Sequence, residues 1–414
     1  MNILIVGVSG FIGRHLYDAL SQQGHHVIGC SRTKIPNINW QKLDFKQSVE
    51  DWEQQLRSEP QPINIVINAV GIYQQSVSQA FAEIHDIGPK KLFAACNKNK
   101  IKVIQISAIG AELTHPATYF LKSKRNADQA LLEGNEANVV LYPGIVLGEQ
   151  GRSTRQLSLL ARLFCMPLVF GKNKELPLIS IHQLTNHIIS LINNWPTAKQ
   201  TNVLVAKPET MEHLLNNLRH WMGLSKGRFI SIPKPLIKLT FFLLPKLSVG
   251  TFNKQSLTML SEYTNKNYVP ITNETASDSL LKSKATANFN KSMKLRMLFY
   301  INLMTLSVIW IVSGLSSLLN IEQSRELIAL TGIEGALGDS IIFTAAIGDI
   351  VLGVLLCLPQ LRRWVIKIQI SVIVIYSLII SIFIPLFWLH PFAPIIKNAA
   401  MIVLALYLLI EEKE

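Results

Sequence analysis

The sequence predicts an α/β fold with a doubly wound parallel sheet, followed by an all-α transmembrane domain of four helices. Three observations predict this. A glycine-rich turn at residues 7–13 follows an apolar run and precedes residues with helical spacing. Strand-like and helix-like segments then alternate, which is typical of a parallel sheet. The last third of the chain is nearly free of charge between short basic clusters.

Composition and charge favour a membrane over a nucleic acid as the partner. Of the 414 residues, 49% are apolar and only 16% are charged, whereas about a quarter is usual in soluble proteins. The net charge is +13, and much of it lies beside apolar segments, where it suits an anionic lipid bilayer. Because the sequence shows no basic face with groove-reading elements, no nucleic acid is expected to bind. The four cysteines lie far apart without metal-ligand spacing, so we expect reduced thiols and no metal site.

Apolar runs and helical spacing predict the elements of the first domain. Short apolar runs are typical of strands buried on both faces of a parallel sheet. We expect strands at residues 3–6, 26–30, 63–68, 103–106 and 139–141. Helices are expected at residues 12–20, 76–98, 121–132, 157–164, 182–193 and 211–224. The first residues lack the basic flank of a signal peptide, so we expect this domain to stay in the cytosol.

Three regions follow one another along the chain. Residues 1–235 are expected to form the sheet domain, with a small substrate lobe at about 145–235. Residues 236–294 are expected to hold an amphipathic segment and a polar linker. The apolar residues at the start of that region are too few to cross a bilayer, so they lie on the membrane or pack on the substrate lobe. Residues 295–414 are expected to form the transmembrane domain.

Four segments are candidates to cross a bilayer, which takes roughly 20 residues. They are residues 298–319, 340–358, 365–388 and 399–410, of which the last spans only if the flanks around Lys397 contribute. Basic residues precede the first segment, and Arg362 and Arg363 lie between the second and third. By the positive-inside rule, both places face the cytosol, and four crossings return the C-terminus there. We therefore expect a multi-pass protein of the cell (inner) membrane, with the sheet domain and the C-terminus cytoplasmic.

The glycine turn has the spacing and context of a dinucleotide-binding site of the Rossmann type. Such a turn brings backbone N–H groups and a helix N-terminus against a pyrophosphate, and a side chain at a glycine position would block that approach. The residues expected to bind the cofactor here are Gly7, Ser9, Gly10, Phe11, Ile12 and Gly13.

The end of the second strand predicts NADP(H) as the cofactor. A carboxylate at this place holds the ribose hydroxyls of NAD, whereas an arginine accommodates the 2′-phosphate of NADP. The chain has Arg32 here and no acid in residues 30–34. The planar guanidinium can bind a phosphate through two hydrogen bonds. Ser31, Lys34 and Arg14 could assist it.

Five short stretches resemble the extended and atypical short-chain dehydrogenase/reductase superfamily over roughly residues 1–235. They are residues 6–13 (VGVSGFIG), 43–44 (LD), 68–71 (NAVG), 106–111 (ISAIGA) and 143–148 (PGIVLG). The resemblance implies that Asp44 faces the adenine, that Ala69 and Gly71 line the cofactor, and that Pro143 lies near the nicotinamide. The serine-containing stretch looks most like the branch that contains the NADPH-binding accessory subunit of respiratory complex I.

Catalytic members of that superfamily pair a serine with a Tyr-x-x-x-Lys motif on one helix face, where the lysine also contacts the ribose. The corresponding residues here are Ser107, Tyr119 and Lys124. Tyr119 precedes Lys124 by five residues, which turns the two side chains about 140° apart on a helix of 3.6 residues per turn. Phe120 occupies the expected tyrosine position. The sequence leaves open whether Tyr119 turns inward or Lys124 only binds the ribose.

The C-terminal region, about residues 295–414, resembles the DoxX-like domain that is fused behind such Rossmann domains. The resemblance rests on residues 388–398 (WLHPFAPIIKN), on residues 348–353 (GDIVLG), and on Trp310 and Gly314. Asp349 is a carboxylate within a predicted membrane span, so it needs a partner or a polar cavity. His390 and Lys397 are candidate partners. Such an Asp349 fits an ion pair that fixes helix packing, or a proton or quinone site.

The sequence therefore predicts a membrane-tethered, NADP(H)-binding protein similar to short-chain dehydrogenases/reductases. The first hypothesis is an oxidoreductase or isomerase that acts on a lipid-like or quinone-like substrate at the cytosolic membrane face. The alternative is a non-catalytic NADPH-binding membrane protein that serves complex assembly or redox sensing. A third possibility is a transporter-like helix block that the Rossmann domain regulates.

Overall fold

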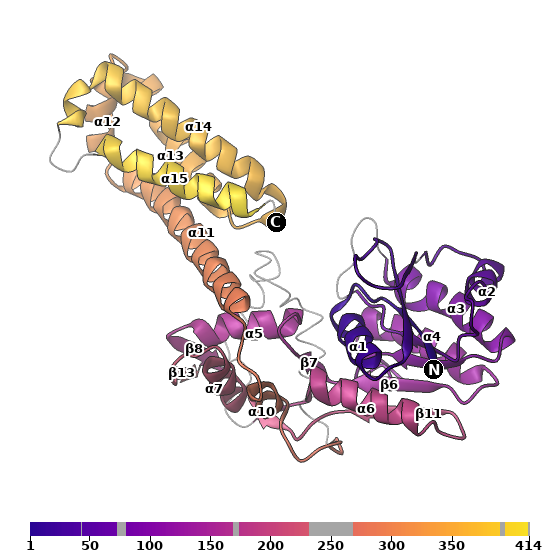
Figure 1. Cartoon of the computed structure of the whole chain (residues 1–414). Coiled ribbons are helices and arrows are strands. Elements are labelled where there is room, and N and C mark those ends of the chain that lie inside the picture. The colour runs from indigo at the N-terminus through magenta and orange to yellow at the C-terminus, as the bar shows by residue number, and fades with distance from the viewer. Residues whose placement is uncertain (43, 73–79, 169–173, 232–267, 390–393, 413–414) are drawn as a thin grey trace. The chain divides into compact units, whose positions relative to one another are not determined.

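Seven parallel strands form the centre of the N-terminal part of the chain, which confirms the predicted parallel sheet and adds two strands, at residues 40–42 and 200–204, that the sequence did not predict. The computed structural model describes residues 1–42, 44–72, 80–168, 174–231, 268–389 and 394–412. They divide into two units, which we describe separately (Figure 1). Of the described residues, those within 1–231 and 268–286 belong to the first unit, and those within 287–412 belong to the second.

The central sheet has the strand order β11-β6-β5-β4-β1-β2-β3, and every neighbouring pair is parallel. Its strands are β1 (Asn2–Val6), β2 (His26–Ser31), β3 (Trp40–Lys42), β4 (Ile65–Asn68), β5 (Lys102–Ile106), β6 (Val139–Pro143) and β11 (Gln200–Leu204). All residues of β1, β4 and β6 are buried, which explains their continuous apolar runs. The strand order reverses between β1 and β4, and ligands of such sheets bind outside the carboxyl ends of the strands at this switch point.

Helices cover both faces of this sheet. One apolar cluster joins it to α1 (Phe11–Gln22) and α6 (Ile181–Asn193). Another cluster joins its opposite face to α2 (Val49–Arg57), α3 (Gly88–Lys98) and α4 (Tyr119–Glu133). A π-helix, η1 (Ala82–Ile87), precedes α3. The predicted helix at residues 76–98 therefore begins as a π-helix, and its start at residues 76–79 lies outside the described residues.

Smaller elements follow β6 in a lobe beside the carboxyl ends of the strands. Its helices are α5 (Arg152–Arg162) and α7 (Met211–Trp221). Its short strands pair as β7 (Ile145–Leu147) with β10 (Leu178–Ser180), β8 (Cys165–Leu168) with β13 (Arg228–Ser231), and β9 (Glu175–Leu176) with β12 (Glu209–Thr210). These elements lie within residues 145–235, where a small substrate lobe was expected, but α6 and β11 of that range belong to the central sheet and its cover.

Part of the predicted linker is folded onto this lobe. Residues 268–286, here called the return segment, contain α10 (Ala276–Leu281) and belong to the first unit. The buried carboxylate of Glu209 accepts hydrogen bonds from the backbone N–H and the hydroxyl of Ser277. Burial raises the pKa of Glu209, and the Ser277 and His213 hydrogen bonds oppose this rise. The expected amphipathic segment at residues 235–245 lies outside the described residues.

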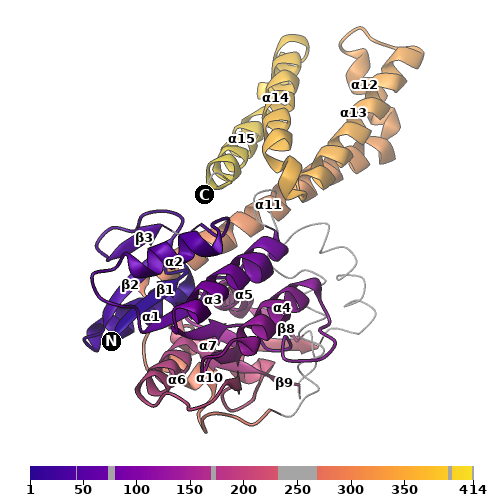
Figure 2. The same cartoon turned by 90° about the vertical axis from the view of Figure 1, so that its right-hand side faces the viewer.

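The second unit consists of helices. They are α11 (Ala287–Leu319), α12 (Ile321–Ala329), α13 (Gly335–Leu355), α14 (Pro359–Phe383), η2 (Pro385–Trp388) and α15 (Pro394–Glu411). Figure 2 shows α14 beside α15, and α11 also packs closely against α13. Among the described residues, α11, α13 and α14 are long and apolar enough to cross a membrane. The fourth predicted span corresponds to α15, whose crossing stays a prediction.

Close backbone contact and buried polar side chains connect these helices. A side chain at Gly314 would overlap the carbonyl oxygen of Ala346, which explains why α11 has glycine where it meets α13. Asp349 on α13 accepts a hydrogen bond from Ser313 on α11 (3.1 Å). This serine is a polar partner that the sequence did not predict. His390 lies outside the described residues. The Ser313–Asp349 bond fits the packing interpretation of Asp349.

Candidate active site

The glycine turn lies at the carboxyl end of β1, at the switch point of the sheet. Gly7 has a φ of +94°, which favours glycine, and a side chain there would come within 2.9–3.0 Å of Ala69 and Val70. A side chain at Gly13 would overlap the carbonyl oxygen of Gly7. The turn is held by hydrogen bonds from Gly7 N to Cys30 O (2.8 Å) and from Gly10 N to Gly7 O (2.9 Å). The backbone conformation of the turn and its close packing therefore require glycine at positions 7 and 13.

The N-terminus of α1 is suited to hold a pyrophosphate. The helix begins at Phe11, and its N-cap residue, Gly10, supplies no capping side chain. The first N–H groups of a helix have no partner within it, and they attract an anion through the helix dipole. Ser9 and Gly10 are exposed, so this end is accessible. The geometry fits a dinucleotide, and contacts of Ser9, Phe11 and Ile12 with its pyrophosphate stay a prediction.

The residues after β2 are placed for the adenosine end of the cofactor. Arg32 is exposed directly after this strand, as is Lys34. Ser31 instead maintains the turn, because its hydroxyl donates to Thr33 O (2.8 Å) and accepts from Trp40 Nε1 (2.9 Å). Asp44 is exposed, and its carboxylate accepts a hydrogen bond from the backbone of the next turn, Lys46 N (2.9 Å).

The carboxyl ends of β4, β5 and β6 carry the residues that the family resemblance places near the nicotinamide. Ala69 and exposed Gly71 follow β4, and their contact with the cofactor stays a prediction. Pro143 ends β6 and is buried, and its carbonyl accepts from Ile109 N (3.0 Å). A side chain at Gly71 would lie 3.5 Å from Lys124 Nζ. Lys124 therefore reaches the cofactor side of the sheet from α4.

Lys124, Ser107 and Asp128 form a buried group under this part of the site. Lys124 Nζ donates to Ile106 O (3.2 Å), and Ser107 Oγ donates to Asp128 Oδ2 (2.5 Å). Lys124 is 5% exposed and Asp128 is 1% exposed. Asp128 follows Lys124 by four residues, so both lie on the same face of α4. Ser107 and Lys124 thus come together as the sequence predicts, with Asp128 as an additional member.

Burial changes the proton affinity of both charged members. It lowers the pKa of Lys124 to about 8, although the nearby Asp128 charge favours the ammonium form. Burial also raises the pKa of Asp128 to about 6, and the hydrogen bond from Ser107 and the charge of Lys124 limit the rise. Such shifts are typical of groups that exchange protons near neutral pH.

The structure separates Tyr119 from this group, in contrast to the predicted catalytic set. The Thr118 side chain caps α4 by accepting from Leu121 N (3.3 Å), so Tyr119 is the first residue of the helix. Tyr119 is 52% exposed, whereas Phe120 and Lys124 are buried. The five-residue offset is the physical reason, since it turns the two side chains about 140° apart. Phe120 occupies the inward position that the superfamily's tyrosine has.

A buried histidine completes the surroundings of Lys124. His85 on η1 accepts a hydrogen bond from Ile72 N at Nε2 (2.9 Å), and its Nδ1 contacts Ser123 Oγ (3.2 Å). The ring stacks on Phe81 and meets the edge of Phe120. Burial and the Lys124 charge lower the pKa of His85 to about 2, so it stays neutral. The sequence did not predict a role for His85. Neither the π-helix nor the nearness of His85 to Gly71 and Lys124 leaves a local pattern in the sequence.

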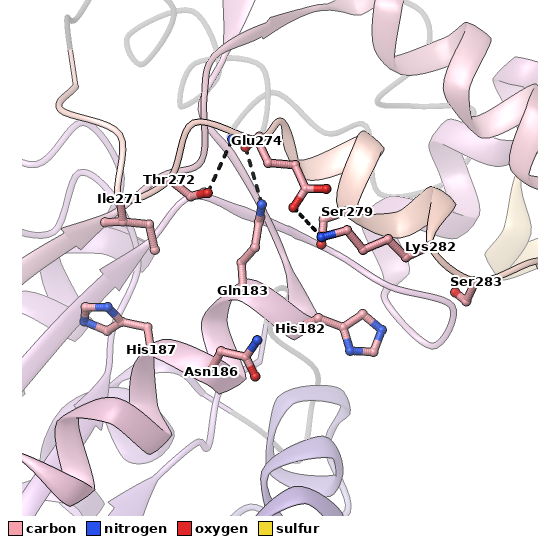
Figure 3. Close-up of a pocket in the computed structure, with 10 residues that line it drawn as sticks. All are labelled: His182, Gln183, Asn186, His187, Ile271, Thr272, Glu274, Ser279, Lys282 and Ser283. Carbon is pink, nitrogen blue, oxygen red and sulfur yellow. Dashed lines mark hydrogen bonds and ion pairs between the residues drawn. The ribbon is translucent and has the colours of Figure 1, made fainter.

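The structure also holds a cavity of about 630 Å³ elsewhere in the first unit. It lies between α6 and the return segment, and Figure 3 shows its lining. The side chains there are largely polar, with His187 and Asn186 on α6 opposite the Lys282–Glu274 ion pair (2.7 Å). None of the predicted cofactor or catalytic residues is among those lining it. We therefore assign the chemistry to the carboxyl ends of the sheet strands.

Comparison with known protein families agrees with this geometry. Residues 3–163 match the NAD dependent epimerase/dehydratase family, and residues 307–406 match the DoxX-like family. The chain joins an epimerase-type Rossmann domain to a DoxX-like domain. The expected family resemblances are thereby confirmed for both regions.

Two relatives of known name extend over more than half of the chain. A mitochondrial protein of Arabidopsis thaliana, NADH dehydrogenase (ubiquinone) 1 alpha subcomplex subunit 9, is 22% identical over 246 residues. The match covers 56% of this chain and 61% of the relative, so the chain spans about three fifths of that protein's length. The ceramide reductase of Caulobacter vibrioides is 20% identical over 237 residues, covering 56% of this chain and 74% of the relative.

Solved structures confirm the fold of the first unit. The UDP-glucuronic acid 4-epimerase of Bacillus cereus, in complex with NAD, has a TM-score of 0.51 and 17% identity. The alignment covers 71% of this chain and 99% of the epimerase. Its complex with UDP-glucuronic acid and NAD gives a TM-score of 0.50, with 16% identity and coverage of 71% and 100%. Together with the family match, these findings support a nicotinamide dinucleotide cofactor and an enzyme of the oxidoreductase or epimerase type.

Proposed function

We propose that this chain is an NADP(H)-dependent oxidoreductase that reduces a carbonyl, or oxidises the corresponding alcohol, of a lipid-like substrate at the cytosolic face of the cell membrane. The observation that carries the proposal is the buried Ser107, Lys124 and Asp128 group near Gly71, in a chain that continues into three long apolar helices. When bound, the dinucleotide supplies or accepts the hydride. The protein residues bind it, orient the substrate and exchange the proton.

A surface of the substrate lobe supports a substrate from the membrane. Phe164, just before β8, is 72% exposed, and Ile230 on the paired strand β13, opposite Pro167, is 51% exposed. The Arg228 guanidinium lies over the Phe164 ring (5.5 Å), and Lys226 is exposed near it in the sequence. Exposed apolar side chains beside cations suit the interface of an anionic bilayer. The ceramide reductase relative is consistent with a lipid substrate. A quinone-like molecule is the alternative substrate, because it has the same apolar character.

The second unit supports the proposed orientation. Arg362 at the start of α14 forms an ion pair with Glu412 (3.1 Å), just after α15. Because the pair joins these two ends, they lie on the same side of the bundle. The basic residues around Arg362 would be cytosolic by the positive-inside rule. This supports a C-terminus on the cytosolic side, together with the Rossmann domain.

The position of Arg32 predicts preference for NADPH over NADH. We expect Arg32→Ala to weaken NADPH binding by roughly 10-fold to 100-fold, because a hydrogen-bonded charge pair contributes about 1.5–3 kcal/mol. NADH binding should change by less than about threefold, since NADH lacks the 2′-phosphate. Titration calorimetry of the full chain in detergent measures both constants, with Arg57→Ala, an exposed arginine on α2, as the matched control. Equal weakening of both cofactors would contradict the assignment.

Activity is tested on the full chain in nanodiscs. We expect the protein to oxidise NADPH when 3-keto ceramide, in which a ketone replaces the 3-hydroxyl, or ubiquinone is supplied. Mass spectrometry of the molecules that stay bound during purification identifies further substrates. Failure of every such lipid, with NADPH bound, would contradict the oxidoreductase proposal.

The second candidate function is a non-catalytic NADPH-binding membrane protein for complex assembly or redox sensing. The exposed Tyr119 favours it, because the superfamily's acid–base tyrosine is then missing from the site. The likeness to an NADH dehydrogenase subunit is consistent with it. In that case, cells that lack the gene should regain their normal phenotype with the Ser107→Ala protein. They should not regain it with the Gly13→Ala protein, which loses the cofactor.

A further inference from the structure

The inward position on α4 lacks a group that can donate a proton. Phe120 is buried there against His85, with ring centroids 5.2 Å apart. His85 cannot replace the tyrosine, because its low pKa keeps it neutral and its Nε2 already accepts from Ile72 N. A reacting carbonyl oxygen nevertheless needs a proton when it receives a hydride. The donor must therefore be another group of the site.

Ser107 and Asp128 have the geometry of a proton-transfer pair. Their oxygen atoms are 2.5 Å apart, which is the range of strong hydrogen bonds between a hydroxyl and a carboxylate. Ser107 directly follows the carboxyl end of β5 and is 5% exposed, while its partner Asp128 on α4 is 1% exposed. A substrate at the strand ends can thus contact the serine, whereas the aspartate can act only through it.

We propose that Asp128, acting through the Ser107 hydroxyl, exchanges the proton with the reacting oxygen in place of the superfamily's tyrosine. The inference rests on the proposed function and adds the path of its proton. In reduction, the dinucleotide gives the carbonyl carbon a hydride with both electrons. The carbonyl oxygen takes the Ser107 proton, and Ser107 Oγ takes the proton of the Asp128 carboxyl. Asp128 ends as a carboxylate and regains a proton from water after product release. Oxidation of the alcohol follows the reverse order.

The charges around Asp128 allow it to gain and lose this proton. On its own helix it faces Lys124, with Arg125 further away. On β5, Gln105 faces Asp128. Its Oε1 accepts a hydrogen bond from Asn68 Nδ2 on β4 (2.8 Å), so its amide nitrogen is turned to donate to Asp128. From β6 it faces Tyr142, whose pKa is raised by burial, so that phenol stays neutral. Since the pKa of Asp128 is about 6, the acid form needed for reduction is lost as the pH rises above about 6.

Infrared spectroscopy tests the pair without any cofactor. Between pH 4 and 8, the full chain in detergent should show a carboxyl C=O band that disappears with a midpoint of about 6. Asp128→Asn should remove this band, while Asp86→Asn, a matched variant on η1 beside Lys90 (2.6 Å), should keep it. Persistence of the band in Asp128→Asn, or its absence from the wild type, overturns the proposal.

Kinetics distinguish a proton path from a structural contact. Asp128→Asn keeps the shape and the acceptor for Ser107, so NADPH affinity should stay within about threefold. Turnover of the 3-keto ceramide probe should fall by at least about 100-fold, in line with the usual contribution of acid–base catalysis. The wild-type turnover should fall above pH 6, and the residual turnover of Asp128→Asn should not follow that profile. Unchanged turnover with the wild-type pH profile overturns this inference alone. A wild type that binds no dinucleotide, or binds it without turnover, overturns the proposed function as well.

Discussion

Gly13→Ala is expected to weaken binding of NADPH and NADH alike by at least about 100-fold, or about 2.8 kcal/mol at 1.4 kcal/mol per tenfold. The added Cβ would overlap the carbonyl oxygen of Gly7, so either the turn or the start of α1 must move. Gly7 is itself fixed by its φ of +94° and by its bond to Cys30 O (2.8 Å). The displacement therefore falls on the N–H groups that would hold the pyrophosphate.

Two comparisons make this result specific. At Gly10 the added Cβ would lie 3.2 Å from Gly7 O, so Gly10→Ala should cost less affinity than Gly13→Ala. Gln22→Ala, at the far end of the same helix, should bind as the wild type does. Calorimetry measures affinity, and thermal unfolding checks that each variant is folded. Wild-type affinity in a folded Gly13→Ala protein would contradict the location of the cofactor.

The sequence was sufficient for strands β1, β2, β4, β5 and β6 because their signals are local, but it did not predict the two edge strands, β3 and β11. The run at residues 3–6 is apolar since β1 is buried on both faces, and Gly7 and Gly13 are glycines since the turn leaves no room for a side chain. Charge-free stretches of membrane length likewise predict α11, α13 and α14. Such features can be recognised without knowledge of any distant contact.

The remaining features depend on contacts between segments far apart in the chain. The polar composition of residues 268–286 indicates a linker, but Glu209 binds Ser277 and holds this segment on the lobe. The Ser107–Asp128 bond likewise joins β5 to α4 across 21 residues. Its only local signal is the four-residue spacing from Lys124 to Asp128, which places both on one helix face. That spacing alone cannot show which strand the face meets.

Lys124→Met is expected to abolish turnover and to weaken NADPH binding by about 10-fold or more. Lys124 is the charged group nearest to Gly71 whose position the structure gives, with Nζ 3.5 Å from the place of a Gly71 side chain. In the superfamily that lysine contacts the cofactor ribose, and a buried ammonium makes strong hydrogen bonds there. Methionine fills a similar volume without the charge. Lys122→Met, on the exposed side of the same helix, is the matched control and should leave both quantities unchanged.

Comparison of Lys124→Met with Tyr119→Phe separates the roles of Lys124 and Tyr119. Since the pKa of Lys124 is about 8, wild-type NADPH affinity should decline as the pH rises above 8 and the ammonium is lost, while Lys124→Met should show no such decline. Without the lysine charge, the pKa of Asp128 should rise further, because a nearby positive charge that favours the carboxylate is removed. Tyr119→Phe should alter turnover by less than about twofold, because its side chain lies on the exposed side of α4. A loss of turnover in Tyr119→Phe that exceeds the loss in Lys124→Met would instead mean that α4 turns on substrate binding and that the tyrosine is the acid.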